Sequence, residues 1–285
     1  MNAKKNTNME LSENMNGTAA KSDLKPLLSC DGVEAYHADI YDLMKTIDDG
    51  SIDLIVTDPP YGSLDLDWDV AQDYSKLFPE FFRITKENAA IIIFSQQPYA
   101  TDIIQAARKY FRYEIIWEKT MKLGYVNAKK MPLRGHENLL VFYKKLPIYN
   151  PQKYYIGQQK WARETNQAED RYSGYGPGTK KSVYVDDGYR YPHSVLEISN
   201  FNGGGRRENI HPTQKPIDLF RWLIRSYSNE RDLIFDGFAG SFTAGIACIQ
   251  ENRRFLGCEK EAEFFEKAKK RILRKLRSPE LPLAT

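Results

Sequence analysis

Short apolar runs alternate with amphipathic stretches along most of this 285-residue chain, and this pattern restricts its fold more than any other feature. Runs of β-branched and aromatic residues at 52–57, 89–94 and 113–117 have the length and composition of strands. The segments 74–85 and 101–110 between them suit helices. Strands that alternate with helices are typical of a mainly parallel sheet covered by helices. We therefore expect an α/β fold with a doubly wound sheet.

The alternation is lost between residues 147 and 205, where Tyr, Gln, Lys, Arg, Gly and Pro dominate. Further strands are predicted at 138–143, 232–236 and 254–257, and further helices at 217–227, 243–250 and 261–277. The sequence therefore predicts one sheet domain in two halves, 24–144 and 206–285, with an irregular insertion at 145–205. Residues 1–23 are polar, and we expect a disordered tail there rather than a targeting signal.

The composition argues against membrane-spanning, fibrous and metal-stapled proteins. No apolar run approaches the roughly 20 residues that a bilayer span needs. The three cysteines, Cys30, Cys248 and Cys258, are sparsely placed and form no Cys-x-x-Cys pair, so neither a disulfide framework nor a zinc site is indicated. We expect a reduced, cytoplasmic protein that requires no metal.

The net charge of +3 conceals a division along the chain. Residues 1–80 contain 6 basic and 16 acidic residues, whereas residues 119–181 contain 13 basic and 4 acidic ones. Nine of the 18 tyrosines lie from Tyr143 to Tyr191, which overlaps the basic stretch. A basic, aromatic segment is what a surface for a polyanion requires, although a solvated face of mixed loops would have the same composition.

Asp58-Pro59-Pro60-Tyr61 directly follows the strand predicted at 52–57. Ligands of open parallel sheets bind beyond the carboxyl ends of the strands, so a site is expected here. The two prolines offer no N–H group and have a fixed φ, so the loop presents carbonyl oxygens and a carboxylate in a rigid frame. Its complement is a group with two N–H donors, such as an exocyclic amine, and Tyr61 can stack on the base that bears it. The alternative is a strand-to-turn junction with a Tyr in the core.

A second motif, residues 233–245, ends a predicted strand at Asp236, turns through small residues at 239–241 and enters a helix. It matches neither a Walker A loop nor Gly-x-Gly-x-x-Gly, so it suits a nucleotide without phosphate specialisation. Glu259 follows 23 residues after Asp236, at the end of the next strand, which is the usual spacing for a carboxylate that binds ribose hydroxyls. The alternative is a plain βαβ turn with a solvated Glu.

A third motif, His211-Pro-Thr-Gln-Lys-Pro216, opens the helix predicted at 217–227. The N–H groups at the start of this helix, with Lys215 nearby, would attract a carboxylate. A simple helix entry explains the same residues.

The three motifs together resemble the amino-group DNA methyltransferases that use S-adenosylmethionine. In this chain Asp-Pro-Pro-Tyr comes first, then the basic segment, then His-Pro-Thr-Gln-Lys-Pro and the Phe-Ala-Gly loop, an order similar to the permuted β class of that family. The resemblance implies a Rossmann-like methyltransferase fold. In that fold 24–144 is the catalytic half, 206–285 the cofactor-binding half and 145–205 a target recognition insertion.

The resemblance also implies residue roles. The residues that hold the amino group of a flipped adenine and stack on its ring are Asp58, Pro59, Pro60 and Tyr61. The residues that bind S-adenosylmethionine are Asp39, Thr213, Lys215, Asp236, Phe238, Ala239, Gly240, Ser241, Thr243 and Glu259. Among them, Glu259 takes the ribose, Asp39 lies near the cofactor adenine, and Lys215 with Thr213 holds the methionine end.

Double-stranded DNA is the expected partner, and no membrane is. Phosphate contacts and base reading are expected from basic residues of the insertion, because Lys and Arg neutralise phosphates and Arg reads guanine. The predicted DNA-binding residues are Lys153, Lys160, Arg163, Arg171, Lys180 and Lys181. A homodimer and a cognate restriction endonuclease are left open as further partners.

Two positions depart from the family pattern Asp-Pro-Phe-x-Gly-Ser-Gly-Thr: Gly237 replaces the proline and Phe242 the second glycine. Phe242 removes a residue that adopts φ > 0 without cost and adds bulk near the cofactor, so we expect an adjusted cofactor pocket. A catalytically inactive DNA-binding relative is therefore one alternative. A cytosine-N4 methyltransferase is another, although Asp58 favours adenine N6, since the cytosine-specific relatives more often carry Ser there.

Overall fold

A computed structural model of the chain describes residues 24–30, 32–62, 66, 69–157, 187–200, 210 and 213–277. Its contacts divide the chain into two units. The larger unit consists of Met1–Asn150 and Ser194–Thr285, and the smaller one of Pro151–His193.

In the described part of the smaller unit, β7 (Tyr154–Tyr155) and β8 (Tyr189–Arg190) form a short antiparallel sheet. The Lys153 ammonium lies 4.5 Å from the centre of the Tyr191 ring, which is a cation–π contact. The other predicted DNA contacts and the predicted tail at 1–23 lie outside the described residues. Those contacts are Lys160, Arg163, Arg171, Lys180 and Lys181.

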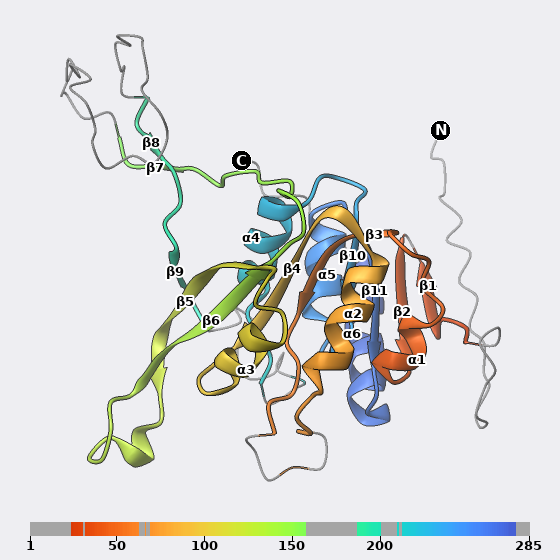
Figure 1. The fold of residues 1–285 in the computed structure, drawn as a ribbon, viewed down its shortest axis with the longest axis horizontal. Helices are drawn as coiled ribbons and strands as arrows, with labels where there is room; N and C mark the ends of the chain where they lie inside the picture. The colour runs from red at the N-terminus through yellow and green to blue at the C-terminus, as the bar shows by residue number, and fades with distance from the viewer. Residues whose placement is uncertain are drawn as a thin grey trace. The chain divides into compact units, whose positions relative to one another are not determined.

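The described residues of the larger unit form one sheet flanked by helices (Figure 1). The strands lie side by side in the order β1 (Leu28–Cys30), β2 (Val33–His37), β11 (Arg254–Glu259), β10 (Leu233–Asp236), β3 (Ile52–Thr57), β4 (Thr85–Ser95), β6 (Arg134–Phe142), β5 (Phe111–Leu123) and β9 (Val195–Ile198). The helices are α1 (Ile40–Met44), α2 (Tyr74–Ile84), α3 (Tyr99–Ala106), α4 (Ile217–Tyr227), α5 (Thr243–Gln250) and α6 (Ala262–Arg277), with a 3-10 turn at Tyr125–Asn127.

The central strands β2, β11, β10, β3 and β4 are parallel. The chain leaves β3 through α2 toward β4, and it leaves β10 through α5 toward β11. The two connections therefore diverge on either side of the β3–β10 pair. An open parallel sheet has its ligand crevice at such a point, beyond the carboxyl ends of the strands.

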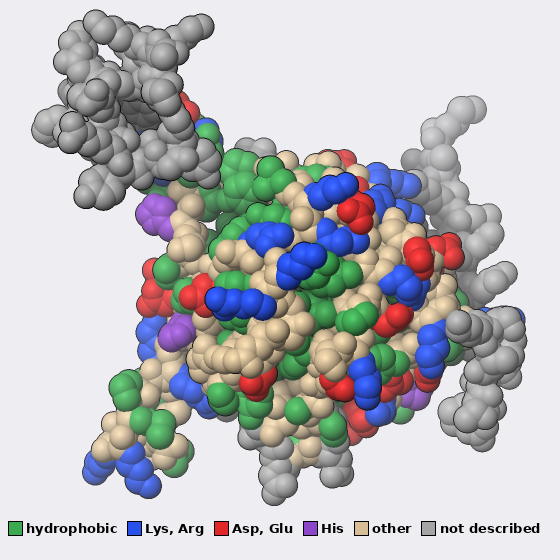
Figure 2. Space-filling view, viewed as in Figure 1, with side chains coloured by type: hydrophobic (Ala, Val, Ile, Leu, Met, Phe, Trp, Pro, Cys, Tyr) green, Lys and Arg blue, Asp and Glu red, His purple; other side chains and the backbone are tan. Residues whose placement is uncertain are grey.

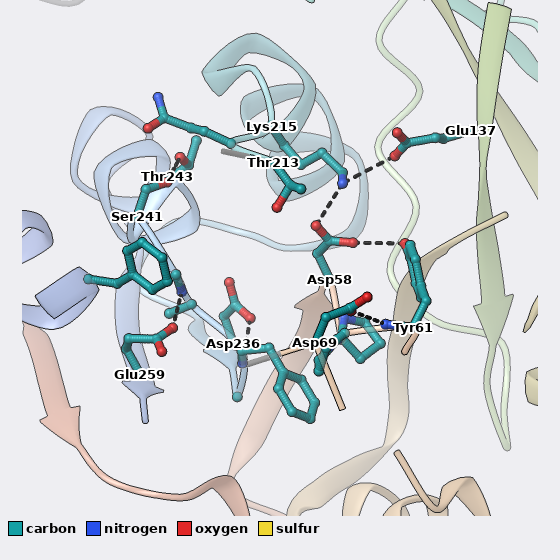
Figure 3. A pocket seen from close by; sticks show the side chains of 18 of the residues that line it. Asp58, Tyr61, Asp69, Glu137, Thr213, Lys215, Asp236, Ser241, Thr243 and Glu259 are labelled. Atoms are coloured by element: carbon teal, nitrogen blue, oxygen red, sulfur yellow. Dashed lines mark hydrogen bonds and ion pairs between the residues drawn. The ribbon is translucent and has the colours of Figure 1, made fainter. Parts of the chain in front are cut away.

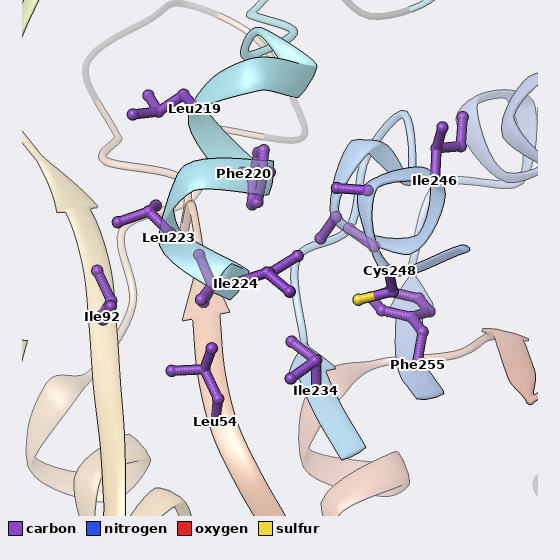
Figure 4. Packing of buried hydrophobic residues seen from close by; sticks show 14 of the residues in the cluster. Leu54, Ile92, Leu219, Phe220, Leu223, Ile224, Ile234, Ile246, Cys248 and Phe255 are labelled. Carbon is purple, nitrogen blue, oxygen red and sulfur yellow. The ribbon is translucent and has the colours of Figure 1, made fainter. Parts of the chain in front are cut away.

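Side chains alternate between two buried clusters, one on each face of the sheet. In β4, Ile92 belongs to the cluster covered by α4, α5 and α6, whereas Ile91 belongs to the cluster covered by α1, α2 and α3. Figure 4 shows Leu223 and Ile224 of α4 over Leu54 of β3 in the first cluster. Burial on both faces explains why the central strands are continuous apolar runs in the sequence.

The predicted α/β fold with a mainly parallel sheet is confirmed. Several features differ from the sequence-based expectation. Strands β1 and β2 and helix α1 are not predicted by the sequence pattern, and β4 begins at Thr85, which the pattern assigns to a helix. Strands β5 and β6 extend far beyond the predicted runs, and Val195–Ile198, which the sequence places in the insertion, pairs with β5 in the large sheet. Only Leu196 is buried in that last strand, so it has little hydrophobic pattern to detect. No helix in the described part of the chain is long and apolar enough to cross a membrane.

Candidate active site

A cavity of about 510 Å³ lies at the carboxyl ends of β3, β10 and β11. All four predicted catalytic residues and all ten predicted cofactor-binding residues line it, from Asp39 near one end of the chain to Glu259 near the other. Sites for small molecules and cofactors typically have volumes of roughly 300–1,000 Å³. The sheet thus brings the three sequence motifs into one cavity of suitable size (Figure 3).

The loop after β3 is held by side chains and prolines. The Tyr61 hydroxyl donates a hydrogen bond of 2.8 Å to Asp58, and the backbone N–H groups of Tyr61 and Gly62 donate to the buried Asp69 at 2.9 and 3.1 Å. The ring of Tyr99 stacks on that of Tyr61, with the ring centres 5.6 Å apart. The aromatic ring and the carboxylate of this loop are therefore fixed relative to each other.

A row of alternating charges begins at Asp58 and runs along the cavity lining through Lys215 and Glu137 to Lys119. The Lys215 ammonium lies 2.7 Å from the Asp58 carboxylate and 3.2 Å from that of Glu137. Glu137 is in turn 2.5 Å from the Lys119 ammonium. These side chains are almost fully buried, since the most exposed of the four, that of Asp58, retains only 18% of its accessible surface.

Burial and charge act against each other in this row. Burial disfavours the ammonium of Lys215, but the carboxylates of Asp58 and Glu137 outweigh it and raise the pKa of Lys215. Burial likewise opposes the ionised form of Glu137, yet Lys215 and Lys119 together lower its pKa. For Asp58 burial dominates and raises the pKa, although Lys215 opposes the rise.

The loop after β10 is held mainly by backbone groups. Asp236 accepts hydrogen bonds from the Thr57 hydroxyl at 2.7 Å and from the Phe238 N–H at 3.2 Å. The Glu259 carboxylate accepts one from the Gly240 N–H at 2.8 Å, where the turn requires a φ of +49° at that glycine. Burial raises the pKa of Asp236 to about 7 and also raises the pKa of Glu259.

Neither Asp236 nor Glu259 forms an ion pair with any residue that the structure describes. Both carboxylates line the cavity, and each has only neutral donors as partners. Removing carboxylates from water without a cation is costly. This end of the cavity is therefore suited to a ligand that carries positive charge.

The departures Gly237 and Phe242 have a structural explanation. A Cβ atom at position 237 would lie 2.1 Å from the Cδ1 atom of Ile40, so the side chain of Ile40 fills the room that a larger residue would need. Phe242 does adopt a positive φ, of 54°. Its ring, however, is fully buried between Phe255 and Phe265 and is not part of the cavity lining in the described structure. The expectation that Phe242 adds bulk near the cofactor is therefore wrong.

Asp39, Thr213 and Lys215 line the cavity from two further segments. Asp39 is the N-cap of α1 and accepts a hydrogen bond from the Tyr41 N–H at 2.9 Å. Thr213 and Lys215 come from the segment before α4, with Pro216 as the N-cap of that helix. The resemblance assigns Lys215 to the methionine end of the cofactor, and in the structure its ammonium reaches Asp58 and Glu137.

Sequence reasoning missed Lys119, Glu137 and Asp69, all of which line the cavity. Asp69 accepts a hydrogen bond from the Tyr61 N–H, and Glu137 forms an ion pair with Lys215, so both contact residues of the motifs. Lys119 forms an ion pair with Glu137 in turn. One signal for Glu137 was its position just before the apolar run 139–142, and in the structure it lies within β6, at the start of that strand's buried part.

Comparison with known proteins identifies the family. The family model described as DNA methylase, which covers N6 and N4 enzymes, matches residues 52–270, and the chain belongs to this family. The prediction of an amino-group DNA methyltransferase is thus confirmed.

Related proteins span most of the chain. Type II methyltransferase M.HpaI of Haemophilus parainfluenzae is 28% identical over 249 residues, which are 80% of this chain and 70% of that protein. DNA adenine methyltransferase YhdJ of Escherichia coli (strain K12) is 27% identical over 252 residues, which are 83% of this chain and 81% of that protein. The crystal structure of the M1.HpyAVI–SAM complex has 23% sequence identity and a TM-score of 0.57, and the match covers 84% of this chain and 98% of that one. The structural match shows a shared fold.

Proposed function

We propose that this protein is a site-specific DNA methyltransferase that transfers a methyl group from S-adenosylmethionine to the N6 amino group of an adenine flipped out of duplex DNA. The observation that carries this proposal is the cavity with two unlike ends. One end is the Asp58–Tyr61 loop, with its rigid acceptors and ring, and the other is the acidic end formed by Asp236 and Glu259.

Asp58 and the Pro59 carbonyl accept the two hydrogens of the amino group. Each carboxylate oxygen of Asp58 already accepts one bond, from Tyr61 or from Lys215, and keeps a further lone pair. The Pro59 carbonyl is the second acceptor, and Pro60 places no competing N–H beside it. Held in this way, the amino nitrogen would direct its lone pair at the methyl carbon of S-adenosylmethionine. The N–C bond would form as the S–C bond breaks, with S-adenosylhomocysteine leaving and one amino proton lost, and the residues would promote this in-line displacement by orientation and fixed dipoles.

Tyr61 stacks on the flipped base. Tyr99 already lies parallel to its ring, within 15°, so the Tyr61 side chain loses little freedom when a base is bound. Extruding a base from the duplex costs a few kcal/mol, and stacking on an aromatic ring returns part of this.

S-adenosylmethionine fits the acidic end of the cavity. Its sulfonium and ammonium groups are cationic, and Asp236 and Glu259 have no cation of their own among the described residues. Glu259 binds the ribose hydroxyls and Asp39 lies near the adenine of the cofactor. Lys215 uses two carboxylate contacts, so one of its three N–H donors remains for the methionine carboxylate, beside Thr213. The loop residues on this side are Phe238, Ala239, Gly240, Ser241 and Thr243.

Adenine is favoured over cytosine as the target base by two observations. YhdJ, a relative over most of the chain, is a DNA adenine methyltransferase. Position 58 is Asp, where cytosine-N4 enzymes of the family more often have Ser. The inserted segment 145–205, with Lys153 on its described part, reads the DNA sequence.

Methylation-aware sequencing of DNA from cells that express the protein tests the proposal, because it reveals the modified base and its sequence motif together. We expect N6-methyladenine at one motif, and N4-methylcytosine would contradict the base assignment. In vitro, the protein should transfer tritium from labelled S-adenosylmethionine to unmethylated duplex DNA. The variant Asp58→Ala should lower this transfer by about 10³-fold or more, because it removes the main acceptor at the reacting centre. Asp48→Ala, at an exposed carboxylate outside the cavity, is the matched control.

A further inference from the structure

Strands β5 and β6 extend past their neighbours and form a two-stranded arm. β9 pairs with β5 only from Ile116 to Lys119, whereas β5 continues to Leu123, which pairs with Arg134 of β6. The 3-10 turn Tyr125–Asn127 lies at the tip. We call residues 120–134 the arm, and Figure 1 shows it extending away from the sheet.

The arm presents basic and apolar side chains to solvent (Figure 2). Its charged residues are all basic, namely Lys122, Lys129, Lys130 and Arg134. At the tip, Val126 is 98% exposed and Tyr125 is 69% exposed. No other large hydrophobic side chain in the described part of the chain is as exposed as Val126. Contacts within the chain do not account for an apolar tip of this kind, and such a surface is typical of a binding element.

The base of the arm belongs to the same cavity as Asp58. Met121, Leu123 and Arg134 line the cavity together with the catalytic loop. The Asn200 side chain accepts a hydrogen bond from the Met121 N–H and donates one to the Met121 carbonyl, both at 2.9 Å. Asn200 thereby extends the hydrogen bonding between β9 and β5 beyond the end of β9. These bonds hold the start of the arm beside the cavity.

We propose that the arm grips duplex DNA beside the flipped base, with Tyr125 and Val126 entering the base stack and the lysines contacting phosphates. This inference rests on the proposed function, since it assigns a surface to the same DNA substrate. Proteins that distort DNA insert apolar side chains between base steps and flank them with cationic residues. Lys129 and Lys130 form no ion pair with the described residues, so their charges are available for phosphates.

The first experiment measures DNA binding by the full-length protein, with fluorescence anisotropy of a labelled 30-bp duplex at several salt concentrations. Lys129→Ala with Lys130→Ala should weaken binding and reduce the slope of log K against log salt by about 2, since each lost phosphate contact lowers the slope by about 1. Lys45→Ala with Lys76→Ala, at exposed lysines away from the cavity, is the matched control. A slope unchanged from that of the control would overturn the phosphate contacts.

The second experiment tests the tip. Tyr125→Ser with Val126→Ser should slow single-turnover methylation of a duplex carrying the motif found by sequencing by about tenfold or more, because the variant lacks the groups that stabilise the opened stack. The same variant should match the wild type when the target base lies opposite an abasic site, since that base is already unpaired. Gln105→Ser with Ala106→Ser, at two exposed residues of α3 outside the arm, the cavity and the insertion, is the control.

Equal losses on both duplexes, or no loss on the paired one, would overturn the role of the tip. A change in sedimentation of the tip variant with unaltered DNA affinity would instead identify the arm as a contact between copies of this chain, and would also overturn the inference. A wild-type protein that binds DNA but transfers no methyl group would contradict the proposed function alone, because the anisotropy experiment tests the arm without catalysis.

Discussion

Two loops that follow adjacent parallel strands form the two ends of the cavity, and their buried carboxylates differ in whether a cation is paired with them. After β3, Asp58 is paired with Lys215, which is shared with Glu137. After β10, Asp236 has only the Thr57 hydroxyl and the Phe238 N–H as donors. We call the Asp58 end, where a cation is paired with the carboxylate, the compensated end, and the Asp236 end the uncompensated end. β3 and β10 pair directly, so the two ends lie side by side on the same sheet.

This difference corresponds to the charge of what each end is proposed to bind. The Asp58 end receives a neutral amino group, and a carboxylate that already has its cation needs no charge from the ligand. The Asp236 end receives a cationic cofactor, and buried carboxylates that have only neutral donors among the described residues gain most from a positive ligand. Binding of the cofactor should therefore change the electrostatics of one end much more than those of the other.

Removing one charge from the compensated end should have the largest effect on folding. Glu137→Gln leaves Lys119 buried without a counter-charge and Lys215 with only one, so the free energy of unfolding should fall by about 3–5 kcal/mol. Urea denaturation measures this quantity. Adding Lys119→Met to the same protein should recover part of the loss, because it removes the unpaired ammonium.

Glu118→Gln provides the control for that experiment. Glu118 pairs with Lys122 on the same strand, but both side chains are substantially exposed, and surface pairs contribute roughly 0–1 kcal/mol. If Glu137→Gln were no more destabilising than Glu118→Gln, the buried row of charges would not be what holds this end of the cavity.

Asp236, at the uncompensated end, should make the free energy of unfolding depend on pH. Asp236 has a pKa of about 7 in the folded protein and an ordinary value of 3.8, so between these values the folded state keeps a proton that the unfolded state has lost. The contribution of Asp236 to the free energy of unfolding is therefore greatest below about pH 4. It decreases as the pH rises toward 7 and is constant above that. The full change is at most about 4 kcal/mol, since one pKa unit corresponds to about 1.4 kcal/mol.

Asp236→Asn keeps an acceptor for both the Thr57 hydroxyl and the Phe238 N–H but does not titrate. Relative to the wild type, its free energy of unfolding without cofactor should increase from pH 4 to pH 8. Thermal denaturation across this range measures the difference. A constant difference between the two proteins would mean that Asp236 does not carry a raised pKa.

The sequence was sufficient to predict those parts of the site that are set by where single strands end. Asp236 ends β10 and Asp58 directly follows β3. Because the carboxyl ends of parallel strands lie at the same edge of a sheet, their meeting in one cavity follows from the α/β pattern. The charge row could not be predicted. The Lys119–Glu137 pair depends on the register of β5 with β6, and Lys215 reaches Glu137 from the segment before α4, far away in the sequence. The direction of the Phe242 side chain also could not be predicted. It depends on the positive φ of this residue, with which the ring packs against Phe255 and Phe265.

The smallest expected effect concerns how tightly the uncompensated loop packs against α1. Gly237→Ala places a Cβ atom 2.1 Å from the Cδ1 atom of the buried Ile40, which must then move. Because that atom is the end of a flexible side chain, the cost should be about 1–3 kcal/mol of unfolding free energy. Ile40→Ala opens the space, so Gly237→Ala should cost clearly less in that background, and a double-mutant cycle by urea denaturation measures the coupling. Equal costs in the two backgrounds would mean that Ile40 does not restrict position 237, and that glycine is required there by the backbone instead.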